Sequence, residues 1–273
     1  MPASSELVYL DEQGLAAAVT ALGVNPRQGQ AGDRKTILVA HDPVSRLSLL
    51  RVPLETGEST RAEELGSTLN LEEGAVLLTS LEGGEEASRL VSRESTYKGK
   101  PLPLELMRVH HPPEIDVRMG APLYDAAGRL LGISYRRAQE FGNGTFVFPA
   151  EAIERVWRGS RKNEIVERSW FGVELLATDP MPVVQGVLQN SPAAAAGLQK
   201  GDILLKIGER RVANYAAAVN AFYYLLEGKP TDVLLLRGTE RLSLTVVPEL
   251  VPAATVSPAL PAQTEPTTSS TAN

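Results

Sequence analysis

The sequence contains no cysteine and only three histidines among its 273 residues. The lack of cysteine excludes disulfides, thiol catalysis and cysteine-ligated zinc. The formal net charge is −6, whereas nucleic-acid-binding surfaces are usually strongly basic, so we expect no nucleic-acid partner. We also expect no cofactor and no metal site.

Long apolar runs are missing as well. No stretch approaches the ~18 residues that would predict a membrane-spanning helix, so we expect no membrane span. The first 20 residues lack the basic start and apolar core of a signal peptide, and none is expected there. The chain is 43% hydrophobic and 22% charged, which is typical of proteins that bury ordinary hydrophobic cores.

The pattern of the first 160 residues predicts a mainly β fold. Short apolar runs, such as residues 47–52, alternate with turn signals about every ten residues, which is typical of a barrel or sandwich. Residues 15–24 suit either a helix or a strand. Residues 150–157 are expected to form a helix, because Ile153 and Trp157 stand four apart and share one face.

Residues 190–212 carry the most specific pattern in the chain. Ser191 can cap a short helix that begins at Pro192, and Gly197 can end that helix in the left-handed conformation. Residues 200–202 favour a turn, and the apolar run 203–207 has the length of a strand.

This order of elements resembles the PDZ domain, in the form appended to HtrA/Deg-type serine proteases. The resemblance rests on short motifs: Ser-Pro-Ala at 191–193, Ala-Gly-Leu at 196–198, Gly-Asp-Ile-Leu at 201–204, Ile-Gly at 207–208, and Val212. It implies a PDZ domain, a partly open barrel or sandwich with two helices, over residues 161–249. Residues 250–273 are rich in proline, alanine and threonine and are expected to be a disordered tail.

The resemblance also implies a peptide-binding groove. Residues 169–173 resemble the carboxylate-binding loop, whose successive backbone N–H groups can bind a terminal carboxylate while the ligand adds to the next strand. The implied peptide-binding residues are Trp170, Phe171, Gly172, Val173, Glu174, Leu175, Ala218, Val219 and Phe222. The small Ala218 and the large Phe222 predict a preference for an apolar terminal side chain.

Residues 1–160 resemble the chymotrypsin-like domain of the same family at three segments, 19–24, 42–50 and 117–123. These correspond to the segments that supply the catalytic histidine, aspartate and serine, and the matching positions hold Gly23, Arg46 and Met119.

Glycine cannot accept a proton, methionine is no nucleophile for acyl transfer, and arginine would repel a protonated imidazole. We therefore expect a degenerate chymotrypsin-like double β-barrel followed by a PDZ domain. We expect it to have no catalytic residues and no enzymatic activity, that is, to be a pseudoprotease.

The histidines suggest no substitute site. His41 stands beside Asp42 and near Ser45, but triad members usually meet in space rather than along the chain, so a solvated loop histidine is expected. His110 and His111 would point in opposite directions in an extended strand and make a poor chelating pair.

The sequence thus predicts a catalytically inactive HtrA-like protein that binds peptides or protein C-termini by β-strand addition, as a scaffold, chaperone-like or regulatory factor. Two alternatives stay open. One is an active HtrA-like serine endopeptidase in protein quality control, and the other is a regulatory subunit that pairs with an active homologous protease. The resemblance implies a periplasmic or other extracytoplasmic location, and the sequence leaves the oligomeric state open.

Overall fold

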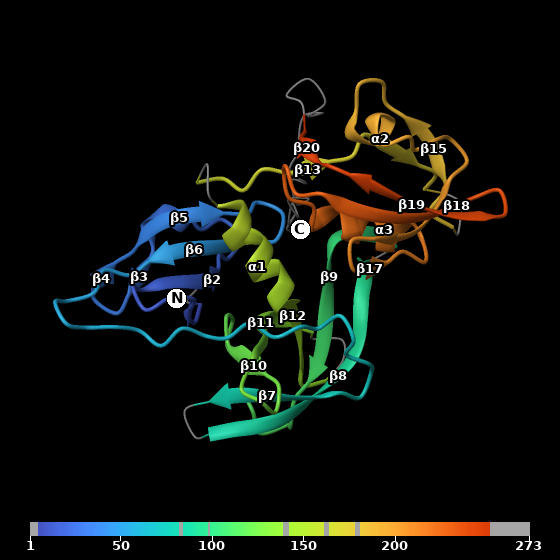
Figure 1. Cartoon of the computed structure of the whole chain (residues 1–273). Helices are drawn as coiled ribbons and strands as arrows, with labels where there is room; N and C mark the ends of the chain where they lie inside the picture. The colour runs from blue at the N-terminus through green and yellow to red at the C-terminus, as the bar shows by residue number, and fades with distance from the viewer. Residues whose placement is uncertain are drawn as a thin grey trace, which may run out of the picture.

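A computed structural model describes residues 5–81, 84–97, 99–138, 142–160, 164–177 and 181–251 of the chain. The expected tail lies outside these residues except for its first two positions. The fold is mainly β, as predicted, and consists of a sheet, a closed barrel and a third unit with its own core (Figure 1). Within the described residues, no helix has both the length and the apolar character that a membrane crossing requires.

The first unit is a four-stranded antiparallel sheet in the order β1-β2-β6-β5, where the first of the two barrels was expected. The ambiguous run 15–24 supplies a strand, because its first five residues are buried and pair with β1 on one side and β6 on the other. A short hairpin and a 3-10 turn lie beside the sheet. The elements are β1 Val8–Tyr9, β2 Leu15–Val19, η1 Pro26–Gln28, β3 Gln30–Ala31, β4 Arg34–Lys35, β5 Ile37–His41 and β6 Leu47–Arg51.

The second unit is a closed barrel in the order β10-β11-β12-β9-β8-β7. Its strands are β7 Val76–Leu81, β8 Gly84–Tyr97, β9 Lys100–His110, β10 Pro122–Tyr124, β11 Leu130–Arg137 and β12 Gly144–Pro149. Strands β8 and β9 form a long hairpin that extends from the barrel to the third unit (Figure 1). The predicted helix follows β12 directly as α1, Ala150–Gly159, and buries Ile153 against the core that it shares with the first sheet.

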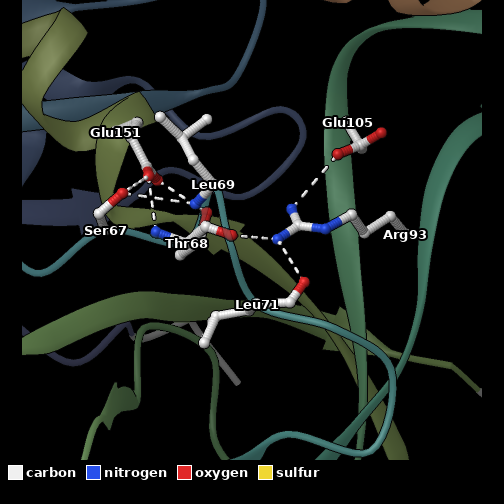
Figure 2. Close-up of polar contacts among 7 residues, drawn as sticks. All are labelled: Ser67, Thr68, Leu69, Leu71, Arg93, Glu105 and Glu151. Atoms are coloured by element: carbon white, nitrogen blue, oxygen red, sulfur yellow. Dashed lines mark hydrogen bonds and ion pairs between the residues drawn. The ribbon is translucent and has the colours of Figure 1, made fainter. Parts of the chain in front are cut away.

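The segment between the sheet and the barrel is held by polar contacts (Figure 2). Glu151, in the first turn of α1, accepts from the backbone N–H of Thr68 at 2.6 Å and from its hydroxyl at 2.9 Å. On the other side, Arg93 of β8 donates to the carbonyls of Thr68 and Leu71 and pairs with Glu105 of β9 at 3.4 Å. These contacts fix the connection between α1 and the long hairpin.

The third unit contains the predicted short helix, and Ser191 caps it as expected by accepting from the N–H of Ala194 at 3.2 Å. The second helix, α3, ends at Tyr223, because Tyr224 and Leu225 donate to carbonyls three residues back and tighten the last turn. The elements are β13 Ser169–Trp170, β14 Val173–Leu175, β15 Val184–Val187, α2 Pro192–Ala195, β16 Ile203–Ile207, β17 Arg210–Arg211, α3 Tyr215–Tyr223, β18 Thr231–Arg237, β19 Glu240–Val246 and β20 Glu249–Leu250.

Buried polar contacts join the third unit to the first sheet. Tyr223, at the end of α3, donates its hydroxyl to Asp42 at 2.7 Å, and Asp42 also accepts from the hydroxyl of Ser45 at 2.7 Å. The guanidinium of Arg155 lies 4.4 Å from the centre of the Tyr223 ring and donates to the Tyr223 carbonyl. Asp42, Tyr223 and Arg155 are all at least 95% buried, so the two units share a buried polar interface.

Candidate functional site

The candidate site begins at the loop between β13 and β14, which the sequence identified as a carboxylate-binding loop. Gly172 has a φ of +81°, in the left-handed region that favours glycine. A Cβ atom at this position would lie 2.2 Å from the Cβ of Ser191, so the loop packs too closely on the start of α2 to admit any side chain. Glycine is therefore required here for both its conformation and its size.

The carbonyl groups of this loop are used within the protein. The Phe171 carbonyl accepts from the N–H of Ala193 at 2.8 Å, and the Gly172 carbonyl accepts from the N–H of Leu188 at 2.9 Å. The backbone N–H groups of Phe171 and Gly172 have no acceptor among the residues that the structure describes. Two consecutive backbone amides without acceptors can together bind an anion such as a carboxylate.

Strand β14 continues from this loop and offers an edge for pairing. It pairs with β15, and no described strand pairs with its other edge. Val173 and Leu175 are half-buried against the core of this unit, whereas Glu174 is exposed. An extended peptide added to this edge would continue the sheet and place its last residue at the Phe171 and Gly172 amides.

Helix α3 supplies the aromatic contact of the site. The rings of Phe171 and Phe222 meet edge to face with centroids 5.8 Å apart, so the structure brings these two predicted residues together. Val219 and Phe222 are half-buried. Ala218 is fully buried within the core of this unit. It therefore packs α3 against the core and, contrary to the prediction, presents no surface to a ligand.

Trp170 has a feature that the sequence did not reveal. Its indole Nε1 is buried and has no hydrogen-bond partner among the described residues. The edge of its ring lies 3.4 Å from the position that a Cβ of Gly172 would occupy. Ser191 is also closer to the loop than its role as a helix cap implied, since its hydroxyl lies 3.5 Å from the Gly172 carbonyl. Neither contact has a sequence signal, because both depend on how the loop meets other elements.

The three positions that match the protease triad lie in the chain's first two units. Gly23 lies in an exposed turn with a φ of +76°. Arg46, also in the left-handed region, donates from Nε to the Thr20 carbonyl at 2.8 Å and from Nη2 to the Ala21 carbonyl. The Met119 carbonyl accepts from the N–H of Glu6 at 2.9 Å.

Two of the three histidines, His41 and His111, lie within hydrogen-bond distance of serine or threonine hydroxyls. His41 is not a solvated loop residue, as we expected, because it ends strand β5, is half-buried and lies 2.9 Å from the hydroxyl of Ser48. Burial, followed by the nearby charge of Arg46, lowers the pKa of His41. His111 is fully buried, and its ring nitrogens lie 2.7 Å from the hydroxyls of Ser88 and Thr145.

Ser48 and Ser88, the serines beside these two histidines, are exposed to 1% or less. Neither hydroxyl is therefore open to a substrate in this conformation. The described residues contain no group of three or more His, Asp or Glu side chains that could hold a metal ion.

Comparison with known protein families matches residues 169–247 to the PDZ domain. Among curated proteins, the mitochondrial serine protease HTRA2 of Bos taurus is 26% identical over 252 residues, which cover 79% of this chain and 52% of the relative. A probable periplasmic DegP-like serine endoprotease of Pseudomonas putida is 25% identical and covers 77% of this chain and 47% of its own length. The chain thus spans about half the length of these relatives.

A shorter match has higher identity. The serine endoprotease DegS of Haemophilus influenzae is 31% identical over 144 residues, which cover 49% of this chain and 42% of the relative. Among solved structures, the HtrA-type protease AlgW with a decapeptide aligns with a TM-score of 0.56 and 23% identity, over 90% of this chain and 82% of that one. This likeness shows that the two proteins share the fold.

The expectation that the chain is not an enzyme is contradicted by these relatives. Each of the three curated relatives is a serine protease or endoprotease by name. The residues Gly23, Arg46 and Met119 therefore do not by themselves exclude enzymatic activity. We withdraw the expectation that the chain is not an enzyme. The chain contains a PDZ domain and is homologous to HtrA-type serine proteases.

Proposed function

We propose that this protein binds peptides or protein C-termini by strand addition between β14 and α3. The observation that carries the proposal is the pair of unused amides at Phe171 and Gly172, at the start of an unpaired strand edge. A carboxylate bound there would accept charge-assisted hydrogen bonds, while the ligand backbone would pair with β14.

The residues around these amides favour an apolar terminal side chain. The aromatic pair of Phe171 and Phe222 and the half-buried Val219 provide apolar surface on the α3 side. Related proteins support peptide binding as a class of activity, since solved structures of AlgW hold a decapeptide or a tripeptide. By binding peptides, the protein would act as a scaffold, chaperone-like or regulatory factor, and an active homologous protease is one candidate partner.

The test is a titration of the full chain with a fluorescent decapeptide that ends in an apolar residue. The same peptide with an amidated C-terminus is the matched ligand, because it differs only in the terminal charge. Hydrogen bonds to a charged group contribute about 1.5–3 kcal/mol, so the free carboxylate should bind at least tenfold more tightly. Equal affinities would reject the carboxylate site, and no binding of either peptide would reject the proposed function.

Peptide-bond hydrolysis is the second candidate function, and the names of the curated relatives favour it. Labelling of the full chain with a fluorophosphonate probe, followed by mass spectrometry, would locate an activated serine hydroxyl. A labelled serine together with inhibitor-sensitive casein cleavage would establish hydrolysis. If the chain is not labelled and does not cleave casein, this candidate is rejected. That result would leave the peptide-binding proposal unaffected.

A further inference from the structure

The elements that form the proposed groove carry a single charged side chain. The loop residues 169–172, strand β15 and helix α3 contain no acidic or basic residue, and β14 contains only Glu174. Glu174 is exposed, and its carboxylate has no ion pair or hydrogen bond with the residues that the structure describes. This one carboxylate therefore determines which charged ligands the groove elements favour.

The side chain of Glu174 lies on the outer face of the β14–β15 pair. Val173 and Leu175 are half-buried on the opposite face, as the alternation of a strand requires. The residue opposite Glu174 in β15 is Gly186, and a carboxylate oxygen of Glu174 lies 2.9 Å from the position that a Cβ of Gly186 would occupy. The carboxylate thus extends over a residue without a side chain and stays accessible from the outer face.

A negative charge at this place opposes the binding of a terminal carboxylate. The proposed carboxylate site, at the amides of Phe171 and Gly172, directly precedes β14 in the chain. The nearest basic residue along the sequence, Arg168, lies before β13 and outside the groove elements. The terminal carboxylate of a ligand and the carboxylate of Glu174 would therefore repel each other, unless the ligand itself brings a positive charge close to its end.

The register of an added strand places one ligand residue opposite Glu174. A ligand whose carboxylate lies at the start of β14 runs antiparallel to this strand, so its terminal residue stands beside Val173 and its penultimate residue beside Glu174. With the terminal side chain directed inward toward Phe222, the penultimate side chain lies on the outer face. Directly opposite residues have Cβ atoms about 4.5–5.5 Å apart, which is close enough for their side chains to form an ion pair.

We propose that Glu174 is a specificity-determining residue of the groove, which selects chain termini with a lysine or arginine at the penultimate position. This inference rests on the proposed binding of C-termini and adds the charge that the ligand carries. The penultimate cation would pair with Glu174 across the two strands and offset the repulsion from the terminal carboxylate. A long basic side chain suits the site, because the Glu174 carboxylate extends toward Gly186 of β15, on the side of β14 away from the ligand.

The experiment titrates the full chain with three fluorescent decapeptides that share a free carboxylate and an apolar last residue. They differ only at the penultimate position, which is lysine, glutamine or glutamate. The lysine peptide should bind about threefold more tightly than the glutamine peptide and about tenfold more tightly than the glutamate peptide. This advantage should shrink as the salt concentration rises.

A fourth peptide controls for the position of the charge. It carries glutamine at the penultimate position and lysine at the third position from the end, where the side chain would point inward. This peptide should bind more weakly than the glutamine peptide, because its cation would be placed against the apolar face and away from Glu174.

Variants of the chain locate the preference at Glu174. Glu174→Gln should bring the affinities of the lysine and glutamate peptides to within about twofold of each other, and Glu174→Lys should reverse their order. Glu240→Gln, which removes an exposed carboxylate of β19 outside the groove, should keep the order of the parent. Circular dichroism melting confirms that each variant is folded.

Two results would overturn this inference and leave the proposed function in place. The first is equal affinity for the lysine, glutamine and glutamate peptides. The second is a preference for lysine that persists in the folded Glu174→Gln protein, which would assign it to another group. Absence of binding by all four peptides would instead reject the proposed function, and this inference with it.

Discussion

Gly172 is the residue on which the proposed groove depends most directly. Its left-handed φ and the 2.2 Å approach of the Ser191 Cβ both exclude a side chain. The Gly172→Ala protein should lose at least about 3 kcal/mol of unfolding free energy, from strain and overpacking together. It should also bind a C-terminal peptide at least tenfold more weakly, because the loop that holds the two amides must shift. Urea unfolding and peptide titration measure the two effects.

The matched control is Gly238→Ala in the turn between β18 and β19. Gly238 has a φ of +60°, but nothing lies within 4 Å of its Cβ position. This variant should lose only about 1 kcal/mol and bind peptide normally. Similar losses in the two variants would show that the approach of Ser191 is not a constraint.

His111 gives the fold a pH-dependent stability. Its burial, together with the neighbouring charge of His110, lowers its pKa from 6.5 to about 4. Between pH 4 and 6.5, His111 is protonated in the unfolded chain but neutral in the folded chain. The free energy of unfolding is therefore unaffected by this residue above pH 6.5 and decreases as the pH falls toward 4. The contribution of this residue should be roughly 3 kcal/mol over that window.

The variant His111→Gln separates this effect from the titration of carboxylates. It should be less stable than the parent at pH 8, because it disturbs the bonds to Ser88 and Thr145, but its stability should fall less between pH 6.5 and 4. His110→Gln removes only the smaller of the two causes of the lowered pKa, so this variant should keep most of the parent's loss of stability between pH 6.5 and 4. If the unfolding free energies of the parent and His111→Gln fall in parallel with pH, His111 is not held neutral in the folded protein.

At the scale of elements, helix α3 serves two surfaces. Phe222 contacts Phe171 in the loop between β13 and β14, while Tyr223 donates a buried hydrogen bond to Asp42, which follows β5. Adjacent residues of a helix point about 100° apart, which allows one helix to line the groove and hold the interface. The end of α3 is therefore fixed by a residue 181 positions away in the sequence.

Two neighbouring tyrosines test this interface. Tyr223→Phe leaves Asp42 short of a donor and should cost about 1–3 kcal/mol of unfolding free energy. Tyr224→Phe removes a buried hydroxyl that has no partner among the described residues, so its effect should be close to zero or stabilising. Urea unfolding of both variants gives the comparison. An equal loss in Tyr224→Phe would show that the bond from Tyr223 to Asp42 is not the source of the effect.

Local chemistry made several elements predictable. The cap at Ser191 and the strand at residues 203–207 depend on neighbours in sequence, and the structure has both. Residues 15–24 were ambiguous because an alanine-rich run favours a helix, and only pairing with β1 and β6 makes it a strand. The burial of Ala218 likewise depends on how α3 rotates against the core.

At the scale of the whole molecule, the family resemblance could be read from sequence, but the contacts between units could not. The interface of Asp42, Arg155 and Tyr223 joins three distant segments whose residues have no shared motif. The ring contacts of Arg136 are equally non-local, because Tyr97, Tyr135 and Phe146 come from β8, β11 and β12. The expectation that the chain is not an enzyme failed for another reason, since it rested on three aligned positions alone, and the named relatives contradict it.

The measurement that tests the central claim most directly is an NMR titration of the deuterated, ¹⁵N-labelled full chain with a C-terminal peptide that has a free carboxylate. We predict the largest amide shifts at Phe171 and Gly172, with further shifts along β14 and α3. The amidated peptide should lose the shifts at the two loop amides. Shifts confined to the barrel, or identical shifts with both peptides, would contradict the account that this PDZ domain binds chain termini.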